Sequence, residues 1–209
     1  MKTTLYLLRH GAAEGNLAKP PRLLGRNDDP PLAKIGVRQA EVTRDFLAVR
    51  AIDVCYCSPL RRAVQTAKIL AEPHEISPRP LPALIECDLG RWENRDWPSI
   101  RAAEPEAYER FMSNPMRHGY PDGESFGDVH RRVQPVFEDI LAKHAGLGVL
   151  VVSHHVVNRV YLANLLGLPP ELVRRVSLDN CGISVVVHED GRTRVSSLNA
   201  VLHLQGVAA

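Results

Sequence analysis

Three short apolar segments, each followed at once by polar residues and then by a helical pattern, constrain the fold of this chain most. The segments are Thr4 to Leu8, Ile52 to Cys57 and Val149 to Val152, and each has the length and composition of a buried strand. Helical spacing follows at 36–49, 58–70 and 156–166. This alternation predicts a layered α/β domain.

A hairpin signal near the end of the chain adds antiparallel strands to this sheet. Ile183 to Val187 and Thr193 to Leu198 flank a turn containing Asp190 and Gly191. The sheet is therefore expected to be mixed. Ligands of such sheets bind beyond the carboxyl ends of the strands. Five polar residues fall at these ends: Arg9, His10, Ser58, His154 and His155.

The remaining segments carry weaker signals. Ser58 and Pro59 fit the N-cap and first position of the following helix. Residues 91–125 hold aromatic and arginine side chains and are predicted to form helix and loops, inserted as a lid-like specificity segment. A long helix over 124–145 contains Pro135, which should kink or break it. We find no linker, so 1–209 is predicted to be one domain.

Composition excludes several classes of function. A net charge of +2 and a pI near 8.4 give no concentrated positive stripe for nucleic acid. The sequence has neither a membrane-spanning apolar run nor a signal peptide, which favours the cytoplasm. The cysteines lack the spacing of zinc sites and are expected to be core residues, without a metal or a local disulfide: Cys55, Cys57, Cys87 and Cys181.

The polar residues at the strand ends suit the chemistry of phosphate esters. Such esters hydrolyse slowly unless cationic donors surround the phosphoryl oxygens and a nucleophile attacks in line. Arg9 offers a guanidinium fork, and His10 offers an imidazole nitrogen that is largely neutral at pH 7. Arg62, in the first turn of its helix, offers a second fork. His154 and the amide of Asn16 complete a substrate-binding set that requires no metal or cofactor.

A proton donor for the leaving alcohol is also needed, and a desolvated carboxylic acid can hold a proton near neutral pH. Glu86 is the candidate, with Asp88 and Glu93 as competitors. His155 is expected to line the substrate pocket or to cap the helix that follows it.

At these residues the sequence resembles a known family. Leu7-Leu8-Arg9-His10-Gly11 is similar to the signature of the histidine phosphatase superfamily, in its phosphoglycerate-mutase-like branch. Further matching motifs cover most of the chain in order: Asn16, Gly25-Arg26-Asn27-Asp28, Pro31-Leu32, Gly36, Ser58-Pro59-Leu60-Arg61-Arg62-Ala63, Gln65-Thr66-Ala67, Leu84-Ile85-Glu86, Gly90-Arg91-Trp92-Glu93, Gly123-Glu124-Ser125 and Val151-Val152-Ser153-His154.

The resemblance implies a three-layer α/β/α domain with a mostly parallel mixed central sheet. It implies that His10 is the phosphorylated nucleophile and that Arg9, Arg62 and His154 hold the phosphoryl group. Glu86 matches the proton donor of the family, and Asn16 matches a residue that contacts phosphate or substrate. Family analogy also allows a homodimer through an edge strand.

Departures from the family pattern bear on the reaction. Leu89 stands where phosphoglycerate mutases usually carry a tyrosine, and Asp96-Trp97 lies where they carry a lysine. His155 replaces a small residue, and Ala12-Ala13 replaces an acidic-hydroxyl pair. We therefore expect a phosphomonoester hydrolase for a small phosphorylated metabolite. The alternatives are a cofactor-dependent phosphoglycerate mutase and a non-catalytic relative that binds phosphorylated ligands.

Overall fold

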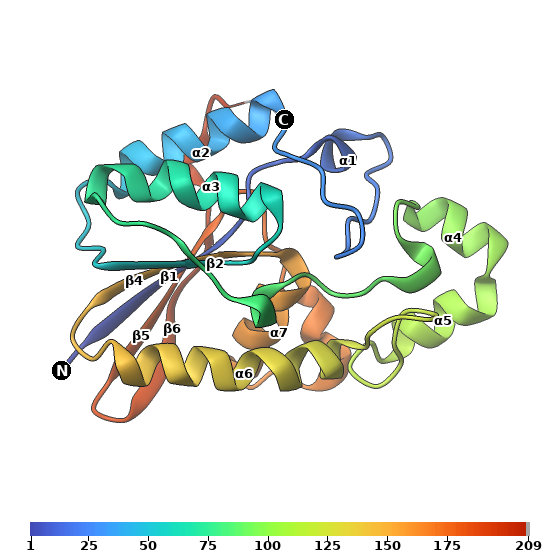
Figure 1. The fold of residues 1–209 in the computed structure, drawn as a ribbon. Helices are drawn as coiled ribbons and strands as arrows, with labels where there is room; N and C mark the ends of the chain where they lie inside the picture. The colour runs from blue at the N-terminus through green and yellow to red at the C-terminus, as the bar shows by residue number, and fades with distance from the viewer. Residues whose placement is uncertain (208–209) are drawn as a thin grey trace.

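A six-stranded sheet runs through the middle of the computed structural model, which describes residues 1–207 (Figure 1). Its strands are β1 (Thr3–Arg9), β2 (Val54–Cys57), β3 (Arg79–Pro80), β4 (Gly148–Ser153), β5 (Ile183–Glu189) and β6 (Arg192–Ala200), in the order β3-β2-β4-β1-β5-β6. The first four strands pair in parallel, whereas β5 is antiparallel to β1 and β6. The predicted mostly parallel mixed sheet, with its hairpin, is confirmed.

Helices cover both faces of the sheet, which gives the predicted three layers. Helices α2 (Lys34–Leu47) and α3 (Arg61–Ala71) lie on one face, and α6 (Phe126–Lys143) and α7 (His155–Leu165) lie on the other (Figure 1). Side chains of a strand alternate between the two faces. In β1, Leu5 and Leu7 accordingly join the core beneath α6 and α7, whereas Leu8 joins the core beneath α2 and α3.

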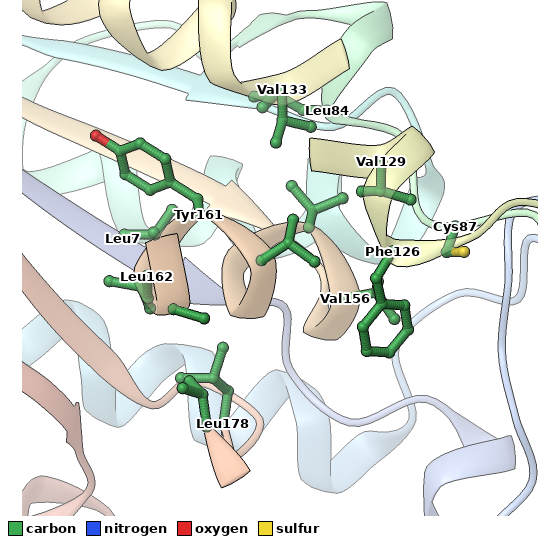
Figure 2. Close-up of a cluster of buried hydrophobic side chains, with 14 of the residues drawn as sticks. Leu7, Leu84, Cys87, Phe126, Val129, Val133, Val156, Tyr161, Leu162 and Leu178 are labelled. Carbon is green, nitrogen blue, oxygen red and sulfur yellow. The ribbon is translucent and has the colours of Figure 1, made fainter. Parts of the chain in front are cut away.

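The core beneath α6 and α7 also anchors the chain that leads to Glu86. Figure 2 shows Val129 and Val133 of α6 and Val156 and Tyr161 of α7 in one cluster with Leu84. Leu84 belongs to the 3-10 helix η2 (Pro82–Leu84) and is fully buried. Because close-packed interiors resist small displacements, this cluster fixes the position of the residues just after Leu84.

The smaller helices α1 (Glu14–Leu17), α4 (Trp97–Ala103) and α5 (Pro105–Ser113) lie beyond the carboxyl ends of the strands (Figure 1). The 91–125 segment has its own aromatic cluster, in which Trp92 is fully buried and its ring centroid lies 5.7–6.1 Å from those of Trp97, Phe111 and Tyr120. Four other short 3-10 helices are η1 (Glu72–His74), η3 (Gly90–Trp92), η4 (Pro170–Arg175) and η5 (Leu202–Leu204).

The predicted N-cap at Ser58 and the predicted break at Pro135 are wrong, whereas a kink at Pro135 stays a prediction. Helix α3 begins at Arg61 with Leu60 as its N-cap, so Ser58 does not cap it. Pro59 and Leu60 separate Ser58 from the first helical residue. The Ser58 hydroxyl therefore stays at the end of β2, where it faces His154. Helix α6 continues without a break through Pro135. A proline removes one helical hydrogen bond, and buried Val133 and Phe137 hold the two sides of the helix in the core.

The four cysteines are free and buried, as core residues are. No helix within residues 1–207 combines the length and the apolar composition that crossing a membrane requires.

Replacement of Gly36 by alanine should destabilise the fold, because α2 passes very close to the loop after β1. A Cβ atom at Gly36 would lie 2.0 Å from the carbonyl oxygen of Ala12, which is backbone and has little room to move. Overpacking of this kind costs about 1–3 kcal/mol. Urea denaturation should show this loss for Gly36→Ala, with less than about 0.5 kcal/mol for the neighbouring surface change Val37→Ala. Equal stabilities would contradict the close packing.

Candidate active site

His10 follows β1 directly, and its ring is held in one orientation. Its Nδ1 lies 2.7 Å from the carbonyl oxygen of Gly11, so this nitrogen carries the proton and donates it to the carbonyl. The lone pair is therefore on Nε2. Burial lowers the pKa of His10 well below its usual value, and the positive charges of Arg62 and Arg9 lower it further. The result is a neutral imidazole with its electron pair on Nε2.

Arg62 lies against this lone pair and is fully buried. Its Nε donates to His10 Nε2 at 3.3 Å, and its two terminal nitrogens donate to the carbonyl oxygens of Asp28 at 3.1 Å and Gly25 at 2.7 Å. The nearest carboxylate oxygen, of Asp29, is 3.7 Å away. Backbone carbonyls rather than a tight ion pair thus orient this guanidinium, which leaves its charge available to a bound anion.

Arg9 and His154 add donors that have no protein partner. Arg9 Nη1 donates to the carbonyl oxygen of Leu178 at 2.9 Å, whereas its buried Nε has no hydrogen-bond partner within residues 1–207. The His154 ring lies edge-on to that of His10, with centroids 5.1 Å apart. Its Nε2 is 2.7 Å from Ser58 Oγ, and its buried Nδ1 is unpartnered in the same described part of the chain. Unpaired buried polar atoms are costly, so these atoms are suited to a polar ligand.

Glu86 is the buried carboxyl group of the site. One oxygen accepts from the backbone N–H of Cys87 at 2.8 Å and the other from that of Val156 at 3.2 Å, in the first turn of α7. Burial raises the pKa of Glu86, while these two hydrogen bonds and Arg62 lower it in part. The net shift is upward, which favours a protonated carboxyl group closer to neutral pH.

A cavity of about 390 Å³ lies beyond the carboxyl ends of β1 and β4; Arg62 and His154 lie beside His10 but do not border the cavity. Arg9, His10, Asn16, Glu86 and His155 all line it. A more open cleft of about 990 Å³ lies over α5 and the start of α6, but none of these five residues borders it. We place the site in the smaller cavity because the buried titratable groups converge there.

A profile of the histidine phosphatase superfamily (branch 1) matches residues 5–201. The chain belongs to this superfamily. It is 31% identical to phosphoserine phosphatase 1 of Hydrogenobacter thermophilus, over 96% of this chain and 93% of that protein. It is 33% identical to a probable phosphoglycerate mutase, GpmB, of Yersinia pestis, over 89% of this chain and 85% of that protein. Among solved structures, YhfR of Bacillus stearothermophilus superposes with a TM-score of 0.88 at 28% identity, covering 97% of this chain and 99% of that one.

The other polar residues that sequence reasoning singled out lie around the site rather than at its centre. Asn16 accepts from the backbone N–H of Ala13 at 3.0 Å and borders the cavity. Asp88 binds Arg26 at 2.6 Å, and Glu93 accepts from the backbone N–H of Asp28 at 2.8 Å. The two competing carboxylates therefore support the 25–29 loop, and Glu86 is the one that borders the cavity.

Several residues of the cavity wall were not predicted: Tyr120, Arg159, Arg174 and Asn180. Asn180 donates to the carbonyl oxygen of His10 at 2.8 Å from a loop with no distinctive motif. Arg159 is one helical turn after His155, and its Nη2 lies 2.7 Å from His155 Nε2. This i, i+4 spacing is the one signal in the sequence that could have joined Arg159 to the site.

The buried histidines should make stability depend on pH. Burial lowers the pKa of His10, His154 and His155 well below the usual value of about 6.5. The unfolded chain therefore binds more protons than the folded one below that pH, so the free energy of unfolding falls as pH falls. Urea denaturation should show that the free energy of unfolding of His154→Asn falls less between about pH 7.5 and about pH 5.5 than that of the wild type. The two proteins should behave alike between about pH 7.5 and about pH 8.5, and equal losses on acidification would contradict this origin.

Proposed function

We propose that this protein hydrolyses phosphate monoesters of small metabolites through a phosphohistidine formed on His10. The observation that carries the proposal is the lone pair of His10 Nε2, which the Nδ1 to Gly11 hydrogen bond fixes on that nitrogen and which accepts from Arg62 Nε at 3.3 Å. A neutral nucleophile among cationic donors suits attack on a phosphate dianion, because the donors offset charge on the phosphoryl oxygens.

In the first step, Arg9, Arg62 and His154 hold the three non-bridging oxygens. His10 Nε2 forms a bond to phosphorus while the bond from phosphorus to the ester oxygen breaks. Glu86 gives its proton to that oxygen, so the alcohol leaves neutral and Glu86 becomes a carboxylate. The raised pKa of Glu86 supports this role, since a larger fraction of the group is protonated near neutral pH.

In the second step, a water molecule replaces the alcohol. The Glu86 carboxylate takes one proton from the water as its oxygen forms a bond to phosphorus, and the bond between His10 and phosphorus breaks. Inorganic phosphate leaves, and both residues return to their starting protonation states. No step requires a metal ion, since the guanidinium groups of Arg9 and Arg62 supply the positive charge and the neutral His154 adds a hydrogen bond.

The substrate class follows from the cavity and is in line with the relatives, one named for phosphoserine and one for phosphoglycerate. A volume of about 390 Å³ suits a small phosphorylated metabolite. Trp97 and Tyr120 of the 91–125 segment border the cavity opposite α7. We propose that this segment acts as a lid that sets specificity for the alcohol half.

Mutase activity is the second candidate, favoured by the similarity to the probable phosphoglycerate mutase. A mutase must return the phosphoryl group to a second hydroxyl before water reacts. Leu89, a side chain without a polar group, borders the cavity where such mutases usually carry a tyrosine. Incubation with 3-phosphoglycerate distinguishes the two, because a mutase forms an isomer whereas a hydrolase releases phosphate.

His10→Ala should lose at least about 10³-fold in kcat for p-nitrophenyl phosphate, because it removes the nucleophile. Wild-type protein should keep its activity in excess EDTA. His118→Ala, which changes a histidine outside the cavity, is the matched control and should retain activity. An active His10→Ala would refute the nucleophile, and loss of wild-type activity in EDTA would refute metal-free catalysis.

Glu86→Gln should affect substrates according to their leaving group. An alkyl alcohol needs a proton as it departs, so kcat for an alkyl phosphate should fall by about 10²–10⁴-fold. p-Nitrophenolate leaves readily without a proton, so the fall in phosphorylation rate for p-nitrophenyl phosphate should be much smaller in single-turnover measurements. Equal losses for the two esters would show that Glu86 is not the acid.

A further inference from the structure

Two guanidinium groups in the cavity wall have no role in holding the phosphoryl group. Arg159 extends from α7, and Arg174 extends from η4. Neither forms a salt bridge with a carboxylate within the described residues 1–207. Their charges therefore face a cavity that Arg9 also lines, with Arg62 beside the lining residue His10.

Neutral groups hold both side chains in place. Arg159 Nε donates to the carbonyl oxygen of Val176 at 2.7 Å, and its guanidinium carbon lies 5.9 Å from the centre of the Phe126 ring. Arg174 donates to the sulfur of Met112, and its guanidinium carbon lies 5.6 Å from the centre of the Trp97 ring. Aromatic faces fix a guanidinium plane without neutralising it. Both groups are thus ordered before any ligand binds.

His155 orients Arg159 further. Burial lowers the pKa of His155 well below its usual value, and Arg159 lowers it again, so the ring is neutral. Its Nε2 accepts from Arg159 Nη2 at 2.7 Å, which places the ring proton on Nδ1. His155, which stands where the family pattern has a small residue, therefore orients the Arg159 guanidinium without adding charge.

The charge in the cavity exceeds what one phosphate requires. Glu86 is the one carboxyl group among the lining residues of the described chain, and it is held by backbone hydrogen bonds from Cys87 and from Val156 in the first turn of α7. Burial and, to a smaller extent, the charge of Arg174 lower the pKa of Arg159 to about 10, and the group still stays charged at neutral pH. Arg9 and Arg62 offset the charge of a phosphate dianion, which leaves Arg159 and Arg174 uncompensated. A cation that is partly withdrawn from water and has no anionic partner is costly, so the wall is suited to a second anion.

We propose that Arg159 and Arg174 form a second anion subsite, and that the preferred substrates carry a carboxylate or a second phosphate besides the phosphoryl group that is removed. This inference rests on the proposed hydrolase function. Two planar forks held on aromatic rings match the geometry of an oxyanion, and each charge-assisted hydrogen bond is about twice as strong as a neutral one. His155 is a positioning residue in this subsite, because it acts through Arg159.

Matched pairs of substrates test the subsite. 3-Phosphoglycerate and glycerol 3-phosphate differ in a carboxylate, and fructose 1,6-bisphosphate and fructose 6-phosphate differ in a phosphate. Wild-type kcat/KM for the more anionic member of at least one pair should be about tenfold higher or more. The pair with the higher ratio of kcat/KM values shows whether the subsite prefers a carboxylate or a phosphate. Ratios near one in both pairs, in a protein that hydrolyses p-nitrophenyl phosphate, would overturn the subsite and leave the hydrolase function standing.

Variants separate binding of the second anion from support of the fold. Arg174→Met and Arg159→Lys should each lower the wild-type ratio by about tenfold, mainly through KM of the more anionic substrate. A purely structural arginine would lower kcat/KM for both members equally, and such an unchanged ratio would overturn the assignment. Arg101→Met is the matched control, since Arg101 also lies over an aromatic ring, that of Tyr108, but outside the cavity, and its ratio should equal that of the wild type. Failure of the wild type to hydrolyse any of the probes, p-nitrophenyl phosphate included, would instead refute the function, and the subsite proposal with it.

Discussion

The candidate site depends on the register of three parallel strands. Arg9 of β1 lies opposite Ser153 of β4, and Cys57 of β2 lies opposite Val152 of β4. The three strands therefore end at the same level, and His10, Ser58 and His154 are the first residues beyond them. Backbone hydrogen bonds continue the pairing by one residue, from His10 N–H to the carbonyl of Ser153 and from Ser58 N–H to that of Val152. A slip of one residue would turn every strand side chain to the opposite face, so the hydrophobic core fixes the site.

This arrangement concentrates positive charge where the protein excludes water. Arg62 is fully buried, and burial lowers its pKa, partly offset by the charge of Glu86. An isolated buried cation opposes folding, and the surrounding core must supply the compensating stability. The two helix layers and the aromatic cluster of Trp92 bury the apolar side chains that supply this stability. The free chain is thus arranged for an anion that it does not itself provide.

Much of this arrangement could be predicted from the sequence. The strand, polar loop and helix pattern placed His10 and His154 at neighbouring strand ends, and the motif series added Arg62 and Glu86. All four meet at one place in the structure, while their chemical roles stay predictions. Ser58 was assigned to a helix cap because serine before proline is typical of one, yet its hydroxyl faces His154. Arg159 and Arg174 were missed since helix and loop arginines are usually solvated, and only tertiary packing brings them to the cavity. The carbonyl oxygens that hold Arg62 could not be predicted either, because every residue carries a backbone carbonyl and the sequence does not show which one accepts.

The order of the strands in space differs from their order along the chain, and this has a consequence for synthesis on the ribosome. Strand β1 is the first strand along the described chain but lies between β4 and β5, which come much later in the sequence. The loop residue Asn180, which holds the carbonyl of His10, also belongs to this late region. A nascent chain that has emerged only as far as α6 has no neighbours for its first strand, and contacts so distant in sequence form late in folding. The complete site should therefore form abruptly, only after β4, β5 and Asn180 have emerged.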